Sequence, residues 1–261
     1  ILGGRRFLLT RPRQNISSLA GRLRSLGAQV IEMPAIRTEP VSPNPLLKES
    51  LERFREREGE KWLVFTSPVG VMVFFEQLVE MKMDLRDLFG GAGTVKAAAI
   101  GSATAAALAA HGIFPDLVPR TYSAGNLGKE LAEKAASGSH ILIARAEQGS
   151  EELIPPLTGA GLTVEDIPLY RTVCEVNSLL KERIREMLGN GEIDGVTFTS
   201  GSTVRGFTQA MGEMDLSNVS AVCIGEQTAR EAEKYGMRIE ISGEASMDAM
   251  VEKLAELYSN V

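Results

Sequence analysis

Short apolar runs alternate with longer amphipathic stretches along this chain of 261 residues. In the first half, apolar runs at 7–10, 30–33, 63–66, 95–100 and 117–119 predict strands. The amphipathic stretches between them predict helices at 17–26, 69–79, 103–110 and 124–135. The strands are almost continuously apolar and alternate with helices, which is typical of a parallel sheet covered on both faces. We therefore expect an α/β fold.

The second half of the chain repeats the pattern of the first half. Residues 6–14 align with residues 140–148, and at the same offset Gly27 meets Gly161. The two glycines fit the position just past the end of a helix. Strands of the second copy are expected at 141–144, 164–167, 196–199, 221–224 and 238–241. The repeat predicts two flavodoxin- or Rossmann-like domains with parallel sheets of about five strands each.

The repeat leaves the assembly of the two domains open. Either the chain breaks once, near residues 137–138, or it crosses between the domains twice, after Pro34 and after Pro168. In the second case, residues 35–38 and 169–173 would be paired extended linkers. A proline biases the residue before it towards extended backbone, but this bias does not decide between the two assemblies.

Composition and charge narrow the classes of function. The formal net charge is −6, and basic residues are interspersed with acidic ones, so we expect no nucleic-acid partner. The apolar runs are much shorter than the ~20 residues that span a bilayer, and we expect neither a membrane segment nor a signal peptide. Cys174 and Cys223 fit buried thiols in a reducing compartment, which favours the cytoplasm. No Cys, His, Asp and Glu cluster has metal-site spacing, so no metal is expected.

Ligands of open parallel sheets bind beyond the carboxyl ends of the strands, and those ends provide the candidate site. Most of them carry small hydroxyls or glycines where a helix is predicted to begin, and a helix start favours anions through its free N–H groups and dipole. The candidate substrate-binding residues are Arg11, Thr66, Ser67, Ser102, Thr104, Tyr122, Ser123, Arg145, Thr199, Ser200, Gly225 and Thr228. For any single hydroxyl, an ordinary helix N-cap is the more frequent role. The first strand lacks the glycine fingerprint of dinucleotide-binding folds, and the chain has no Walker A loop or nucleophile elbow.

Six segments in order resemble the motifs of uroporphyrinogen-III synthases. They are residues 64–71, 98–105, 118–124, 167–172, 196–204 and 223–229. The most characteristic are Tyr-Arg-Thr at 170–172 and Ile-Gly-x-x-Thr-Ala from residue 224. Glu226 and Gln227 stand where the family often has Pro and Thr, which puts a direct role of Gln227 in doubt but not one of Thr228.

The resemblance implies two α/β domains joined by a two-stranded linker, with the substrate in the cleft between them. It favours the double crossover, with residues 1–36 plus 173–261 in one domain and 37–172 in the other. It also implies a monomer without cofactor or metal. Such an enzyme closes hydroxymethylbilane to uroporphyrinogen III, with inversion of ring D and loss of water, for haem, sirohaem and cobalamin biosynthesis.

Two further expectations come from the resemblance, and rival interpretations stay open beside them. Hydroxymethylbilane synthase would be a transient partner that supplies the substrate. Tyr170 is singled out as the catalytic proton donor, with packing in the linker as its alternative role. A binding protein for an anionic metabolite would share the fold, whereas the missing glycine fingerprint disfavours a nicotinamide- or flavin-dependent enzyme.

Overall fold

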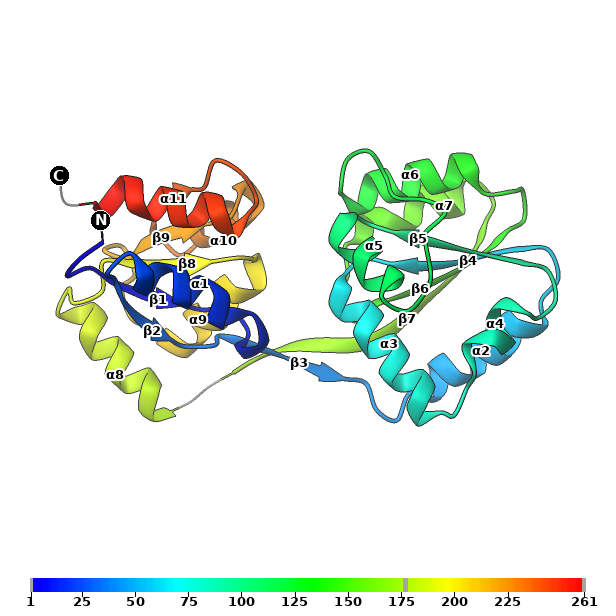
Figure 1. Cartoon of the computed structure of the whole chain (residues 1–261), viewed down its shortest axis with the longest axis horizontal. Coiled ribbons are helices and arrows are strands. Elements are labelled where there is room, and N and C mark those ends of the chain that lie inside the picture. The colour runs from blue at the N-terminus through cyan, green and yellow to red at the C-terminus, as the bar shows by residue number, and fades with distance from the viewer. Residues whose placement is uncertain (1, 176–177, 260–261) are drawn as a thin grey trace. The chain divides into compact units, whose positions relative to one another are not determined.

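The computed structural model describes residues 2–175 and 178–259, and the chain divides into two compact units (Figure 1). Unit 1 comprises Ile1–Thr38 together with Thr172–Val261, and unit 2 comprises Glu39–Arg171. The chain therefore leaves unit 1 after its first 38 residues and returns to it after completing unit 2. Unit 2 is continuous in sequence, whereas unit 1 is not.

Unit 1 contains a sheet of five strands in the order β10-β9-β8-β1-β2. The strands are β1 (Arg6–Leu9), β2 (Gln29–Glu32), β8 (Gly195–Phe198), β9 (Ser220–Cys223) and β10 (Arg238–Ile241). All four neighbouring pairs are parallel. The two parts of the unit join at the centre of the sheet, where Phe7 of β1 is in register with Gly195 of β8.

Helices cover both faces of the unit 1 sheet. Successive strand residues point to opposite sides, and apolar side chains on both sides are buried under helices. Phe7 and Leu9 pack with α1 (Arg13–Ser25) and α11 (Met247–Tyr258). Leu8, between them, packs on the other face with α8 (Ser178–Gly189), α9 (Gly201–Met211) and α10 (Glu226–Glu233). This double burial explains why the strand sequences are almost continuously apolar.

Unit 2 contains a second sheet of five strands, in the order β3-β7-β6-β4-β5. The strands are β3 (Ile36–Pro40), β4 (Glu60–Phe65), β5 (Thr94–Ala99), β6 (His140–Ala146) and β7 (Thr163–Cys174). The pairs β4–β5, β4–β6 and β6–β7 are parallel. Strands β3 and β7 run past the unit boundaries at residues 38 and 171, so both crossings of the chain are made in extended backbone.

The unit 2 sheet is also covered on both faces. One face carries α2 (Pro45–Glu56), α3 (Pro68–Glu80), α4 (Leu85–Phe89) and α5 (Ser102–Ala109), and the other carries α6 (Ala124–Lys134), a 3-10 turn (Glu151–Leu153) and α7 (Ile154–Gly159). Leu63 and Phe65 of β4 face the first layer, and Trp62 and Val64 face the second. None of the helices in the described part of the chain is long and apolar enough to cross a membrane.

The structure confirms the parallel α/β class and the glycine positions, but it corrects one strand. Gly27 and Gly161 directly follow the C-cap residues of α1 and α7, with φ of 89° and 75°, as expected of residues just past a helix end. The strand expected at 117–119 is wrong, because Leu117 forms only an isolated bridge to Ala98. Pro119 has no N–H to donate to a ladder, and this limits pairing at that position.

The side chain of Glu60 connects the amino end of β4 to β5 and to the loop before β6 by hydrogen bonds. Its carboxylate accepts hydrogen bonds from Lys96 Nζ at 2.5 Å, Trp62 Nε1 at 2.8 Å, the backbone N–H of Ala136 at 2.8 Å and Ser139 Oγ at 3.0 Å. Burial acts to raise the pKa of Glu60, but these hydrogen bonds outweigh it and hold the pKa at about 2. The ionised carboxylate therefore stabilises the fold.

Replacing Glu60 should make the stability of the protein less dependent on pH. The folded pKa lies below the ordinary value, so the stabilisation is complete above about pH 4.5 and is lost as the pH falls towards 2. Glu60→Gln should lower the free energy of unfolding by roughly 2–3 kcal/mol at pH 7 and by about half as much at pH 3. Urea unfolding at both pH values measures this, and Glu56→Gln, on an exposed side chain, is the control. An equal loss at both pH values would contradict the prediction.

Candidate functional site

The carboxyl ends of the strands place helix starts along one edge of each sheet. In unit 1, β1 is followed by Arg11, β8 by Thr199 and Ser200, and β9 by Gly225. In unit 2, β4 is followed by Thr66 and Ser67, and β5 is followed by Ile100 and Gly101. Parallel strands end at the same edge, so each unit collects the free N–H groups of several helices there.

Three of the candidate serines are helix N-caps. Ser67 Oγ accepts a hydrogen bond from Gly70 N at 2.9 Å at the start of α3, and Ser123 Oγ accepts one from Asn126 N at 3.2 Å at the start of α6. Ser200 and Thr203 form a reciprocal capping box at the start of α9. Each cap bond occupies one acceptor site of the serine oxygen and leaves the hydroxyl proton available to another group.

Helices α5 and α10 have glycine N-caps instead. Gly101 and Gly225 are N-caps in extended backbone, and neither helix start has a side-chain cap bond. Ser102 is exposed at the first position of α5, whereas Thr104 and Thr228 are buried at the third positions of α5 and α10. The first N–H groups of these two helices therefore remain open to an external acceptor.

Tyr122 lies against the glycine at the start of α5. A Cβ atom added to Gly101 would come within 3.0 Å of the Tyr122 ring atoms Cγ and Cδ2. The side chain is nevertheless 61% exposed. The glycine thus lets an exposed aromatic ring pack directly on the backbone of a helix start.

A bulge in the sheet of unit 2 places Tyr170. Arg145 of β6 pairs with Pro168 of β7, but the next residue, Ala146, pairs with Tyr170 and skips Leu169. A bulge of this kind re-aims the side chain that follows it. Tyr170 is 7% exposed, and its hydroxyl lies 2.9 Å from Ser67 Oγ. Burial raises the pKa of Tyr170 and outweighs the opposing effect of the hydrogen bond between Tyr170 and Ser67, so the phenol is protonated at neutral pH.

The two candidate arginines have different surroundings. Arg145 is almost fully buried, with Nε and Nη2 donating to the two oxygens of Asp166 at 2.8 and 2.7 Å and Nη1 donating to the carbonyl of Ser150 at 2.6 Å. Its guanidinium is thus already paired within unit 2. Arg11 has no acidic partner among the described residues, and its Nε is buried without a hydrogen-bond acceptor. Burial lowers the pKa of Arg11.

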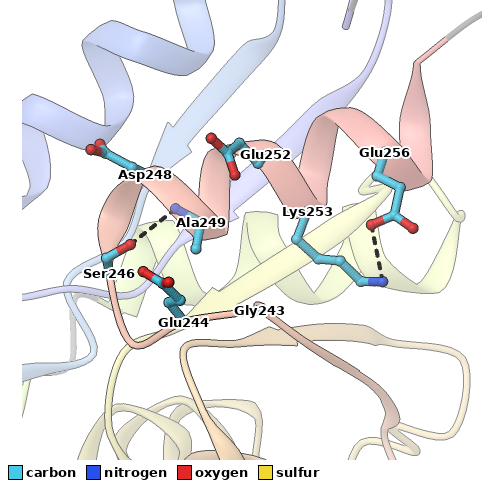
Figure 2. Close-up of a pocket in the computed structure, with 8 residues that line it drawn as sticks. All are labelled: Gly243, Glu244, Ser246, Asp248, Ala249, Glu252, Lys253 and Glu256. Atoms are coloured by element: carbon cyan, nitrogen blue, oxygen red, sulfur yellow. Dashed lines mark hydrogen bonds and ion pairs between the residues drawn. The ribbon is translucent and has the colours of Figure 1, made fainter.

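A hollow of about 820 Å³ lies beside α11, near the carboxyl end of β10, and it has the wrong charge for an anion. Figure 2 shows four carboxylates and one ammonium group around it. The lining residues are Gly243, Glu244, Ser246, Asp248, Ala249, Glu252, Lys253 and Glu256. Lys253 is itself paired with Glu256 at 3.4 Å. A polyanionic ligand would be repelled from this surface.

The structure brings two of the predicted site residues into contact, and it shows further residues at the site that sequence reasoning missed. It brings Ser67 to Tyr170, across 103 positions of the chain. Sequence reasoning missed Asp166, which holds Arg145, and Met247, whose sulfur lies 2.8 Å from Arg11 Nη1. No motif marks either residue, because both contacts depend on how distant segments are placed in space.

Comparison with known proteins identifies the family. The model of a family described as uroporphyrinogen-III synthase HemD matches residues 17–252. The chain belongs to the uroporphyrinogen-III synthase family. It is 33% identical over 257 residues to the porphyrin biosynthesis protein HemD of Ruminiclostridium josui, a match that covers 98% of this chain and 49% of the relative. The chain thus spans about half the length of that relative.

Two other members of the uroporphyrinogen-III synthase family match over most of their length. The uroporphyrinogen-III synthase of Synechococcus elongatus is 28% identical over 257 residues, with 95% of this chain and 93% of the relative covered. The crystal structure of a mutant uroporphyrinogen III synthase from the extremely thermophilic bacterium Thermus thermophilus superposes with a TM-score of 0.66 at 19% identity. That superposition covers 97% of this chain and 98% of the other, and it supports the fold.

In this synthase-family chain, Arg145→Ala and Arg11→Ala should differ in stability. Arg145→Ala should lower the free energy of unfolding by roughly 2–4 kcal/mol, because it leaves Asp166 and the Ser150 carbonyl without their donor. Arg11→Ala should change it by less than about 0.5 kcal/mol, since Arg11 has no acidic partner among the described residues to lose. Urea unfolding of both variants measures this. Equal losses would contradict the contrast, and Arg145→Lys should recover only part of the loss, because an ammonium cannot replace a bidentate guanidinium.

Proposed function

We propose that this chain is a uroporphyrinogen-III synthase, which closes hydroxymethylbilane to uroporphyrinogen III with inversion of ring D and loss of water. The observation that carries the proposal is the family match over residues 17–252. The structure supports it in two ways. The sheet edges offer helix N-termini that suit a polycarboxylate, and a protonated phenol, Tyr170, lies beside one of those helix starts.

Recognition of the substrate would be distributed over these edges. Hydroxymethylbilane carries an acetate and a propionate on each pyrrole ring, and each carboxylate can accept hydrogen bonds from the first N–H groups of a helix. A hydrogen bond to a charged group contributes roughly 1.5–3 kcal/mol, so several such bonds match one arginine. The proposed binding groups are at Thr66, Ser102, Thr104, Tyr122, Ser123, Thr199, Ser200, Gly225 and Thr228, with Arg11 as a cation beside them. Arg145 supports the edge of unit 2 through its pair with Asp166.

The chemistry assigned to Tyr170 is one proton transfer. The phenol gives its proton to the terminal hydroxyl of ring A, the C–O bond breaks with its electron pair on oxygen, and water leaves. The ring A nitrogen supplies electrons and keeps its proton, which gives an electrophilic, protonated azafulvene. Ring D then attacks through its substituted carbon to form a spiro intermediate. The bond from that carbon to the ring C bridge breaks, the bridge bonds to the free carbon of ring D, and that carbon releases the proton that restores the phenol. The remaining catalytic effect is positioning of the chain in the curl that favours this attack.

The setting of the enzyme is part of the same proposal. We propose a cytoplasmic monomer that receives hydroxymethylbilane from hydroxymethylbilane synthase in a transient contact. The two thiols support a reducing compartment, because Cys223 is buried and neither cysteine forms a disulfide among the described residues. No cofactor is part of the proposed reaction, since dehydration and ring closure neither oxidise nor reduce the substrate overall.

The isomer of the product tests the proposed function directly. Hydroxymethylbilane incubated with the protein should give mainly the type III isomer, because the enzyme favours attack at the substituted carbon of ring D over the spontaneous closure to type I. Oxidation to porphyrins followed by chromatography measures the isomer ratio, with heat-denatured protein as the control. Type I product alone at high protein concentration would rule out the proposal.

Replacing Tyr170 should affect turnover more than binding. Tyr170→Phe should lower kcat by about 100-fold and change KM by less than about threefold, because a proton donor acts mainly in the transition state. Steady-state kinetics measure both constants. Tyr235→Phe removes the hydroxyl of an exposed phenol in unit 1, away from Tyr170 in unit 2, and as a control it should leave both constants unchanged. A large rise in KM with an unchanged kcat would instead make Tyr170 a binding residue.

A further inference from the structure

The hydroxyl of Ser67 makes two contacts that compete for its hydrogen-bonding capacity. Ser67 Oγ accepts the N–H of Gly70 at 2.9 Å, and it lies 2.9 Å from Tyr170 Oη. A serine hydroxyl has one proton and two acceptor lone pairs. The Gly70 bond takes one lone pair, so the contact with Tyr170 uses either the Ser67 proton or the second lone pair. These two cases have different consequences for the phenol.

The direction of this hydrogen bond decides where the phenol proton points. If Tyr170 donates to Ser67, its proton is occupied within the protein. If Ser67 donates to Tyr170, the phenol proton is free for an external acceptor. The hydrogen bonds among the described residues include no other acceptor for the proton of either hydroxyl, so only one of the two protons can be used within the pair. Ser67 can therefore satisfy its proton within the protein by donating to Tyr170 Oη.

The pair is held in place by the backbone around it. A Cβ atom at Gly70 would come within 3.1 Å of Ser67 Oγ and 3.4 Å of the Ala144 carbonyl, and 3.9 Å of Tyr170 Cε1. Because Gly70 has no side chain, Ser67 and Tyr170 can pack directly against the first turn of α3. The cap bond fixes the Ser67 side chain, and the Tyr170 carbonyl accepts the N–H of Glu147 at 2.8 Å, which fixes the strand. Rigid supports of this kind are what a proton donor needs.

We propose that Ser67 is a positioning residue, which donates its proton to Tyr170 and so directs the phenol proton to the departing hydroxyl of the substrate. This inference rests on the proposed function. In the step, the phenol O–H bond breaks, its proton completes the leaving water, and the electron pair stays on Tyr170 Oη. The Ser67 hydrogen bond and the positive end of the α3 dipole stabilise that phenolate until the proton from ring D returns.

Kinetics of single and double variants test the coupling between the two residues. Ser67→Ala should lower kcat by roughly 10-fold with less than about a threefold change in KM, and Ser67→Thr should restore most of kcat because it keeps the hydroxyl. On the Tyr170→Phe background, Ser67→Ala should change kcat by less than about twofold, since the group through which it acts is gone. If the fold-losses in kcat of the two single variants multiplied in the double variant, the proposal would be overturned.

A titration of Tyr170 gives a readout independent of activity. In protein labelled with ¹³C at the tyrosine Cζ, Tyr170→Phe identifies the resonance, and its shift with pH reports ionisation of the phenol. Ser67→Ala should raise the pKa of Tyr170, because the phenolate loses a donor. A lowered or unchanged pKa would overturn the proposal.

A second capping serine separates this role from a loss of helix stability. Ser246 caps α11 with the same bond, Oγ to Ala249 N at 3.1 Å, on the acidic surface of unit 1 (Figure 2). Ser246→Ala should lower the unfolding midpoint about as much as Ser67→Ala, yet leave kcat and the Tyr170 titration unchanged. An equal loss of kcat in both variants would reduce Ser67 to a helix cap.

The product isomer separates this proposal from the proposed function. Type I product from the wild-type protein would overturn the proposed function as well. Type III product, together with independent losses of kcat for Ser67→Ala and Tyr170→Phe, would overturn the role of Ser67 alone.

Discussion

Parallel pairing of the strands is the constraint on which the rest of each unit depends. A parallel neighbour can be reached only by a connection that returns over a face of the sheet, so helices cover both faces and the strands are buried on both sides. Phe7, Leu8 and Leu9 are fully buried in succession for this reason. For the same reason, the helices that follow these strands all begin at the edge of the sheet where the strands have their carboxyl ends. The concentration of free N–H groups there follows from topology and needs few special side chains.

The distribution of charge explains why that edge matters in this protein. The net charge is −6, the acidic side of α11 disfavours anions, and the guanidinium of Arg145 is held by Asp166. Arg11 is the candidate cation that has no acidic partner among the described residues. Backbone dipoles can bind carboxylates without adding positive side chains, and they are oriented before the ligand arrives. Glycine N-caps, as at Gly101 and Gly225, keep those dipoles uncovered.

Periodicity in the sequence was sufficient to predict the class of fold, because apolar runs and helix ends are local properties. The run at 95–100 became β5 at Thr94–Ala99, and Gly27 lies just past α1 as expected. The site depends on registers that no local pattern encodes. The bulge that skips Leu169 arises from the pairing of β6 with β7, and it sets where Tyr170 points. Likewise, the hydroxyls at the strand ends were recognisable, but the contact of Ser67 with Tyr170 was not.

The discontinuity of unit 1 has a consequence for the newly made protein. Strand β1 pairs with β8, which the ribosome produces about 190 residues later, or roughly 10 to 40 seconds at ordinary rates of synthesis. Unit 2 is contiguous and can assemble its sheet within that interval. Meanwhile β1, with Phe7, Leu8 and Leu9, has emerged without the strand that will cover its inner edge. An unpaired apolar strand is a template for pairing with other chains, so the segment that carries β1 is exposed to wrong pairing until β8 has been made.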